Sequence, residues 1–210
     1  MEEAEERLGF RLEKFEERAI PVGQILKEAS LGKNSLEKHE LLVIKRKVYE
    51  RILEYLVCEG IPNGSTADFK EANINDLVYT IIAPVIAACS VKLERTIRLP
   101  REKKIAAVDG KYGGYQEFVT VDLIGVSKTK FIFVIEAKWT TLAEAKIQCL
   151  LAIMDMGEIN HGGVVYEFIT TGYHWQMIRY DGKHFTQTNI FDLLFHTMRH
   201  EEEKWLQDYS

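Results

Sequence analysis

The chain has 210 residues, of which 46% are hydrophobic and 28% charged, which is enough for one well-packed domain. Its first residues, MEEAEERLGF, are acidic where a secretory signal peptide would be basic and then apolar. No apolar run reaches the roughly 18 residues that a bilayer-crossing helix needs. We therefore expect an intracellular protein, nuclear or cytoplasmic, with no membrane partner.

The net charge of −5 excludes a protein coated in positive charge, but the charge is unevenly distributed. The segment from Val91 to Lys104 contains six basic residues and two acidic ones. The basic residues are Lys92, Arg95, Arg98, Arg101, Lys103 and Lys104. Such a segment could neutralise the phosphates of a nucleic acid, or it could be only a solvated helix end and strand.

The three cysteines, Cys58, Cys89 and Cys149, lie far apart and form no CxxC pair. This spacing favours reduced thiols over a disulfide framework or a structural zinc site.

Helical periodicity dominates the start of the chain. We expect one helix from Glu2 to Ala19, a break at Pro21 and Gly23, and a second helix from Ser35 to Glu59 with apolar residues every three or four positions. These elements predict that residues 1–66 form a helical N-terminal extension that covers the main domain or a partner.

Residues 67–210 show helical and strand-like segments in alternation. The predicted elements are a helix at Asn73–Leu93, strands at Ile97–Val108, Phe118–Val126 and Phe131–Lys138, a helix at Leu142–Met156, strands at Val164–Thr171 and Trp175–Tyr180, and a helix at Ile190–Leu206. This order predicts an α/β fold.

Charged residues interrupt the two most apolar strands. With a three-residue turn at 128–130, Asp122 would stand opposite Glu136, and Lys138 would lie on the same face. Two carboxylates that close repel each other unless a cation or a bound metal compensates them, and Mg²⁺ accepts one or two carboxylates together with waters and phosphate oxygens. The alternative is an exposed Glu136–Lys138 ion pair, with Asp122 capping a turn or pairing with a nearby arginine.

The spacing of Asp122, thirteen intervening residues and then Glu136-Ala137-Lys138 resembles the PD-(D/E)XK, or restriction-endonuclease-like, nuclease superfamily. The resemblance covers about Asn73 to Phe185. The segments NINDLVY, VDLI, EAKW, QCLLA and GVVYEFITTG are similar to nuclease-fold domains of fungal proteins, including crinkler-type effectors. The resemblance implies a core made of a helix, a three-stranded antiparallel meander, a crossover helix and a further strand or hairpin. The family's proline before the aspartate is Val121 here.

The resemblance also implies roles for individual residues. Asp122 and Glu136 would bind Mg²⁺ or Mn²⁺, Lys138 would be the catalytic lysine, and the carbonyl of Ala137 could complete the metal shell. Asp76, with Glu71 as second choice, is the candidate acid from the first core helix. Gln148 would orient the lysine or the substrate, although the tyrosine that follows it in one branch of the family is Ala152 here. Contacts to the nucleic acid would come from Arg95, Arg98, Arg101, Lys103, Lys104 and Trp139.

Two hypotheses of function follow. The first is a metal-dependent nuclease that hydrolyses phosphodiester bonds, in DNA rather than RNA, for which a homodimer would supply one site for each strand. The second is a nuclease-fold module that has lost turnover and binds nucleic acid or protein as a regulatory or effector domain.

Overall fold

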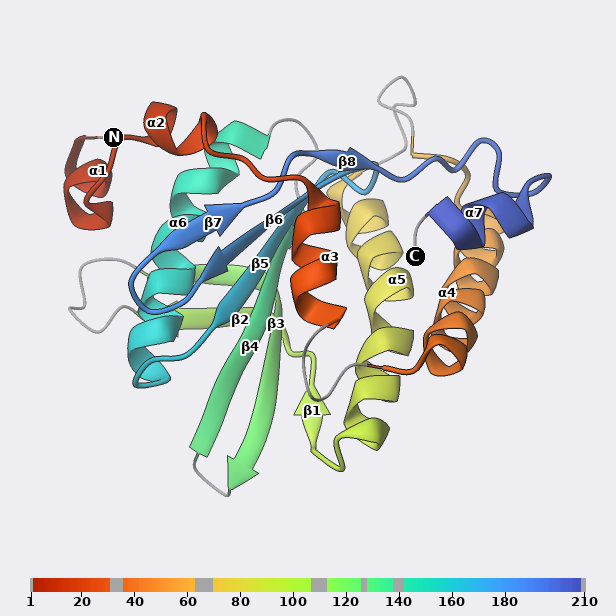
Figure 1. Cartoon of the computed structure of the whole chain (residues 1–210), viewed down its shortest axis with the longest axis horizontal. Coiled ribbons are helices and arrows are strands. Elements are labelled where there is room, and N and C mark those ends of the chain that lie inside the picture. Colours follow the sequence, from red (N-terminus) through yellow and green to blue (C-terminus); the bar gives the residue numbers. More distant parts are fainter. Residues whose placement is uncertain are drawn as a thin grey trace.

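The structure is a computed structural model that describes residues 2–30, 36–62, 70–106, 113–125, 128–137 and 142–208. Within these residues, eight strands form one mixed sheet with helices on both faces (Figure 1). The strands are β1 (Ile97–Arg98), β2 (Arg101–Ala106), β3 (Gly113–Gly125), β4 (Lys128–Ala137), β5 (Val165–Thr170), β6 (His174–Tyr180), β7 (Phe185–Gln187) and β8 (Phe191–Asp192). Their order is β1-β3-β4-β5-β6-β7, with β2 also paired to β3 and β8 to β6.

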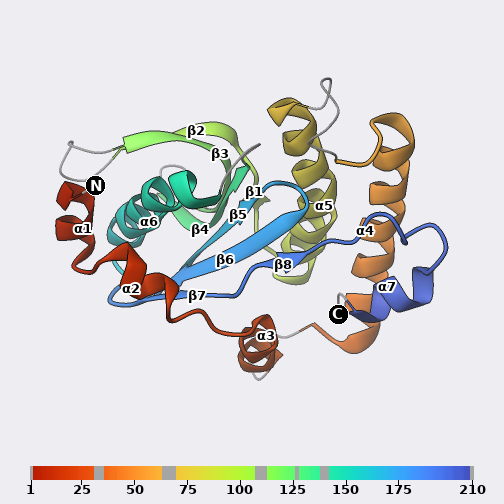
Figure 2. The ribbon, with the colours of Figure 1, turned by 90° about the horizontal axis from the view of Figure 1, so that it is seen from above.

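Two long helices pack on opposite faces of this sheet, α5 (Glu71–Lys92) on one and α6 (Leu142–Ile159) on the other (Figure 2). Each face has its own core. The α6-side core includes Val119, Val121, Val134, Leu150, Ile153, Ile169 and Ile178. The α5-side core includes Ile74, Leu77, Val78, Phe118, Ile135, Ala137 and Trp175. The predicted mixed α/β class is confirmed.

Helix α5 owes its position to apolar residues at spacings of three and four. Ile74, Leu77 and Val78 are fully buried against the sheet. By length and composition, α5 is also the one helix of the described chain that could cross a membrane, although we expected no such run. Core helices of folded proteins meet the same criteria, so this carries little weight.

Strands β4 and β5 are the one parallel pair of strands in the described chain, with Ala137 beside Thr170. Because the two strands are parallel, with α6 as the crossover between them, their carboxyl ends lie at the same edge of the sheet. We call this edge of the sheet the carboxyl edge. Strand β6 begins there and runs antiparallel to β5.

The N-terminal helices contribute to both cores. Instead of one helix from Glu2 to Ala19, the chain forms α1 (Glu2–Leu8) and α2 (Leu12–Glu16), because Gly9 adopts a φ of +77° that ends the first helix. Leu8 and Phe15 are buried in the α6-side core. After α3 (Val22–Ser30), helix α4 (Lys38–Cys58) packs on α5. Its start lies at a capping box of Glu37 and Glu40, and Ser35, where the helix was expected to begin, is outside the described residues.

The predicted helix at Ile190–Leu206 is wrong. This segment contains β8, irregular turns and, at its end only, most of the short helix α7 (Glu202–Asp208). Its apolar residues Phe195 and Met198 are buried in the α5-side core without helical geometry, and the Tyr49 hydroxyl donates to the Met198 carbonyl at 2.5 Å. Strand β7 was not predicted.

Candidate functional site

The pairing of β3 with β4 differs from the predicted one. Asp122 lies opposite Lys130 rather than Glu136. The sequence predicted a turn at residues 128–130. In the structure Lys128 already belongs to β4 and pairs with Gly125. The expected cross-strand contact between Asp122 and Glu136 is therefore wrong.

The two carboxylates also point to opposite faces of the sheet. Asp122 follows Val121, which belongs to the α6-side core, so alternation along β3 directs Asp122 to the α5 side. Glu136 lies between Ile135 and Ala137, which both belong to the α5-side core, so it faces α6. A single metal ion cannot bind both side chains in this arrangement.

Asp122 is paired with an arginine, which is one of the alternatives to metal binding that the sequence left open. Its side chain is 7% exposed, and Arg95 Nη1 donates to its Oδ2 at 3.2 Å. The Arg95 side chain is 60% exposed and links this buried charge to solvent.

Glu136 is buried beside a second acid that sequence reasoning missed. Val134 pairs with Glu167 and Glu136 pairs with Ile169, so Glu167 lies diagonally next to Glu136 on the α6 face. Burial raises the pKa of Glu167 to about 8; the Cys149 thiol on α6 acts against this shift, and the charge of Glu136 adds to it. A glutamate inside the apolar run VVYEFIT was the sequence signal for this pair.

The remaining candidate acids and amides do not join Glu136. Asp76 is exposed on α5, and Arg101 Nη2 lies 3.4 Å from its Oδ1. Gln148 is exposed on α6, whereas its neighbour Lys146 is buried. Glu71 is exposed at the start of α5.

The described arginines of the basic segment lie near β1 and β2. Arg95 and Arg98 are exposed, and the Arg101 guanidinium lies 5.2 Å from the ring centroid of Phe118 and 5.8 Å from that of Tyr79. Lys103 and Lys104 belong to β2, but their side chains are outside the described set. Lys138 and Trp139 lie outside the described residues altogether.

A histidine and an aspartate, neither singled out from the sequence, meet at the carboxyl edge. His174 begins β6 and pairs with Asp192 of β8. The His174 Nδ1 lies 2.6 Å from Asp192 Oδ1. Because Ile178 belongs to the α6-side core, alternation along β6 places His174 on the same face as Glu136.

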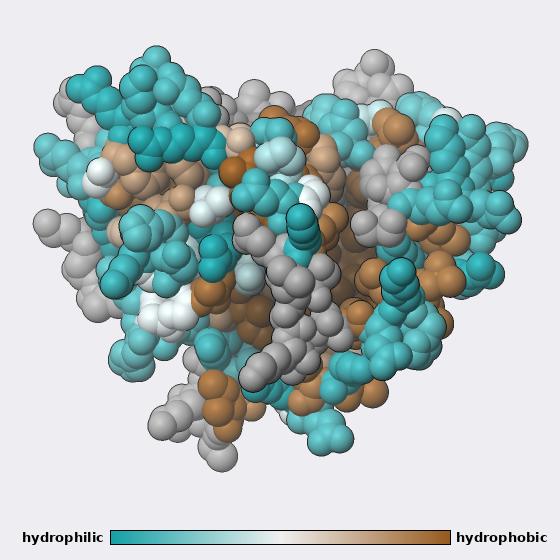
Figure 3. Space-filling model, viewed as in Figure 1, coloured by the Kyte–Doolittle hydropathy of each residue, from teal (hydrophilic) through white to brown (hydrophobic). Residues whose placement is uncertain are grey.

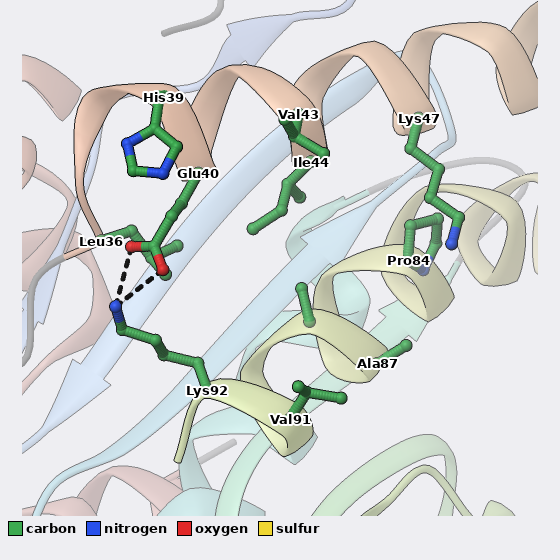
Figure 4. Close-up of a pocket in the computed structure, with 11 residues that line it drawn as sticks. Leu36, His39, Glu40, Val43, Ile44, Lys47, Pro84, Ala87, Val91 and Lys92 are labelled. Atoms are coloured by element: carbon green, nitrogen blue, oxygen red, sulfur yellow. Dashed lines mark hydrogen bonds and ion pairs between the residues drawn. The ribbon is translucent and has the colours of Figure 1, made fainter.

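A hollow lies away from these residues, between α4 and α5, with a volume of about 560 Å³ (Figure 4). Its walls are largely apolar, from Val43, Ile44 and Pro84, and Lys92 binds Glu40 at 2.7 Å beside it. Apolar side chains also show in the hollow beside α3, over α5 (Figure 3). None of the predicted site residues lines the hollow in Figure 4.

Among the described side chains, no group of three or more His, Cys, Asp and Glu is placed to bind a metal ion. Comparison of the sequence with protein-family models and with curated proteins finds no match.

Proposed function

We propose that this chain is a divalent-metal-dependent nuclease with a restriction-endonuclease-like core, acting on DNA. The observation that carries the proposal is the position of Glu136-Ala137 at the end of β4, beside the parallel strand β5. The order of α5, the antiparallel β2, β3 and β4, α6 and β5 agrees with the core that the resemblance implies. Carboxyl ends of parallel strands are also where open α/β sheets bind their ligands.

The metal site in this proposal is centred on Glu136. The fit rests on charge: Glu136 lies close enough to Glu167 for its charge to help raise the pKa of Glu167, and a cation bound at Glu136 would offset that charge. Glu136 and the carbonyl of Ala137 would hold Mg²⁺ or Mn²⁺, a set that such ions accept when waters and phosphate oxygens complete it. Asp122 is left out because it faces α5 and pairs with Arg95.

The chemistry is phosphodiester hydrolysis. A bound divalent ion lowers the pKa of a water and offsets the phosphate charge. Lys138, the next residue after Ala137 in the sequence, would stabilise the charge that develops at phosphorus. Arg95, Arg98 and Arg101 would contribute salt-dependent affinity for the nucleic-acid backbone.

The test is nicking of supercoiled plasmid, and cleavage of single-stranded DNA and of RNA, with Mg²⁺ or Mn²⁺. We expect Glu136→Gln and Lys138→Ala to lower the rate by about 100-fold or more, since the first removes the carboxylate that would hold the metal ion and the second the cation at the reacting phosphate. Asp122→Asn should stay within about tenfold of the wild type, because Asp122 is not part of this metal set. Glu203→Gln, at an exposed position of α7, is the matched control. Equal rates for Glu136→Gln and the control would contradict the proposal.

The second candidate is a nuclease-fold module without turnover that binds nucleic acid or protein. It is favoured by one observation, the placement of Asp122 and Glu136 on opposite faces, which leaves the paired carboxylates of the motif apart. Binding of an oligonucleotide without cleavage of any substrate, by folded wild-type protein, would select this candidate.

A further inference from the structure

The pair formed by His174 and Asp192 has a geometry suited to proton transfer. Asp192 Oδ1 lies 2.6 Å from Nδ1 of the imidazole, and the side chains are 50% and 46% exposed. With Nδ1–H donating to Asp192, the lone pair of the neutral ring is on Nε2, on the side away from Asp192. This is the arrangement in which an aspartate fixes the tautomer of a histidine base.

The position of His174 relative to Glu136 follows from the strand pairing. Glu136 pairs with Ile169, and Ile169 pairs with Gln176. His174 precedes Gln176 by two residues and so lies further toward the carboxyl edge. Two strand spacings and two residues correspond to a backbone separation of about 12 Å. Two side chains on one face can converge across this gap on a phosphate group and a water.

A buried amide lies on the same face, two residues from His174 along β6. Gln176 is 4% exposed, and its Nε2 donates to Gln187 Oε1 at 3.3 Å and to the Thr188 carbonyl at 2.8 Å. Its Oε1 accepts no hydrogen bond from the described part of the chain. A buried acceptor without a donor is costly, and a polar ligand or water at this point would satisfy it.

The backbone of His174 is held firmly. Thr171 N–H donates to the His174 carbonyl at 3.1 Å, and His174 N–H donates to Thr171 Oγ1 at 3.1 Å. Gly172 has a φ of +83°, and a Cβ there would lie 3.3 Å from Leu77 Cδ2, so the turn packs closely on α5. A rigid turn gives the imidazole a fixed position, which a proton-transfer group requires.

We propose that His174 is the general base of the hydrolysis and that Asp192 is its positioning residue. This inference rests on the proposed nuclease function. Nε2 takes a proton from water while the water oxygen forms a bond to phosphorus. The bond from phosphorus to the leaving sugar oxygen breaks, that oxygen keeps the electron pair and takes a proton from solvent, and the imidazolium returns its proton to solvent.

The experiment measures kcat and KM for cleavage of a labelled oligonucleotide by the wild type, His174→Gln and Asp192→Asn. The control is His184→Gln, an exposed histidine 3.9 Å from Asp181 at the far end of β6. We expect His174→Gln to lower kcat by about 100-fold to 10,000-fold with little change in KM, and Asp192→Asn to lower it less. The control should equal the wild type.

The pH profile separates a base from a merely structural residue. Since the base must be neutral, the wild-type kcat should rise with pH and then level off, and His174→Gln should lose this limb. Asp192 is the one charged group that the described residues place within ion-pair distance of the imidazole.

Binding gives a readout besides activity. The imidazole NMR signals of His174 should shift when a cleavage-resistant phosphorothioate oligonucleotide is added, whereas those of His184 should not.

Each negative result has a distinct meaning. Wild-type cleavage that is unchanged in His174→Gln overturns the inference and leaves the proposed function standing, as do His174 signals that stay unchanged at saturating oligonucleotide. A wild type that neither cuts nor binds overturns both.

Discussion

Two buried acids of the sheet, Asp122 on β3 and Glu167 on β5, are accommodated in different ways. Asp122 pairs with Arg95, whose exposed side chain carries the opposite charge. Glu167 is fully buried, and burial is the main cause of its raised pKa. A carboxyl group in that position favours its protonated form at neutral pH.

Glu167 should therefore make stability depend on pH. Its pKa is about 8 in the folded protein against an ordinary value of 4.5, so between these values the folded state binds more protons than the unfolded state. The free energy of unfolding should fall as pH rises through this window, by up to about 1.4 kcal/mol for each unit. Glu167→Gln removes this contribution. The free energy of unfolding of the variant, relative to that of the wild type, should therefore increase from pH 5 to pH 8.

Urea unfolding at these two pH values in a metal chelator checks the prediction. Glu203→Gln, at an exposed site, should keep the wild-type dependence. The prediction is wrong if Glu167→Gln differs from the wild type by the same free energy at both pH values.

At the scale of the elements, the hydrophobic periodicity of the sequence predicts the type and order of helices and strands better than it predicts which strand residues pair. The stripes of α5 and α6 and the alternation of β5 and β6 gave these elements to within a few residues, because each element buries one face of its own sequence. The pairing of β3 with β4 depends instead on the turn, and the polar run Ser127-Lys128-Thr129-Lys130 allows several closures.

The candidate site was missed for the same reason. Pairing jumps from Thr120–Phe133 to Val121–Phe131, which inserts a bulge into β4. The bulge reverses the alternation, so Phe131 packs in the α6-side core and Phe133 against the α5-side core. Glu136 is carried to the face opposite Asp122 by this one extra residue. His174 and Asp192 could not be paired from the sequence because β8 was expected to be helix.

A cross-linking experiment tests this pairing. In a Cys58→Ser background, cysteines at Asp122 and Lys130 should form a disulfide under mild oxidation, since directly paired residues have Cα atoms about 4.5–5.5 Å apart. Cysteines at Asp122 and Glu136 should remain reduced. Mass spectrometry of unreduced peptides measures both, and a disulfide in the second pair would restore the pairing expected from the sequence.

At the scale of the whole molecule, the N-terminal helices belong to the packing of the sheet. Phe15 is 6% exposed, its ring centroid lies 5.2 Å from that of Phe10 and 6.3 Å from that of Phe185, and Gln187 Nε2 donates to its carbonyl. Arg7 of α1 pairs with Asp155 of α6. The sequence predicted helices with an apolar side here, but an apolar side does not specify what it packs on.

Phe15→Ala should lower the free energy of unfolding of the entire chain by about 3 kcal/mol, the usual cost of removing a buried phenyl ring. Leu26→Ala, at a position 50% exposed on α3, should change it by less than about 0.5 kcal/mol. Urea titration followed by circular dichroism and by tryptophan fluorescence provides the measurement. A main transition unchanged in Phe15→Ala would show that the extension is not part of the cooperative unit.

The location of the divalent metal ion can be measured directly. Mn²⁺ broadens the NMR signals of nearby amides, and Lys130, the partner of Asp122, lies six residues from Glu136 along β4, on the order of 20 Å away. At low Mn²⁺ concentrations we expect broadening centred on Glu136, Ala137 and Thr170, sharp signals for Arg95 and Asp122, and loss of the effect in Glu136→Gln. Broadening centred on Asp122, or unchanged in Glu136→Gln, would contradict a metal site at the carboxyl edge.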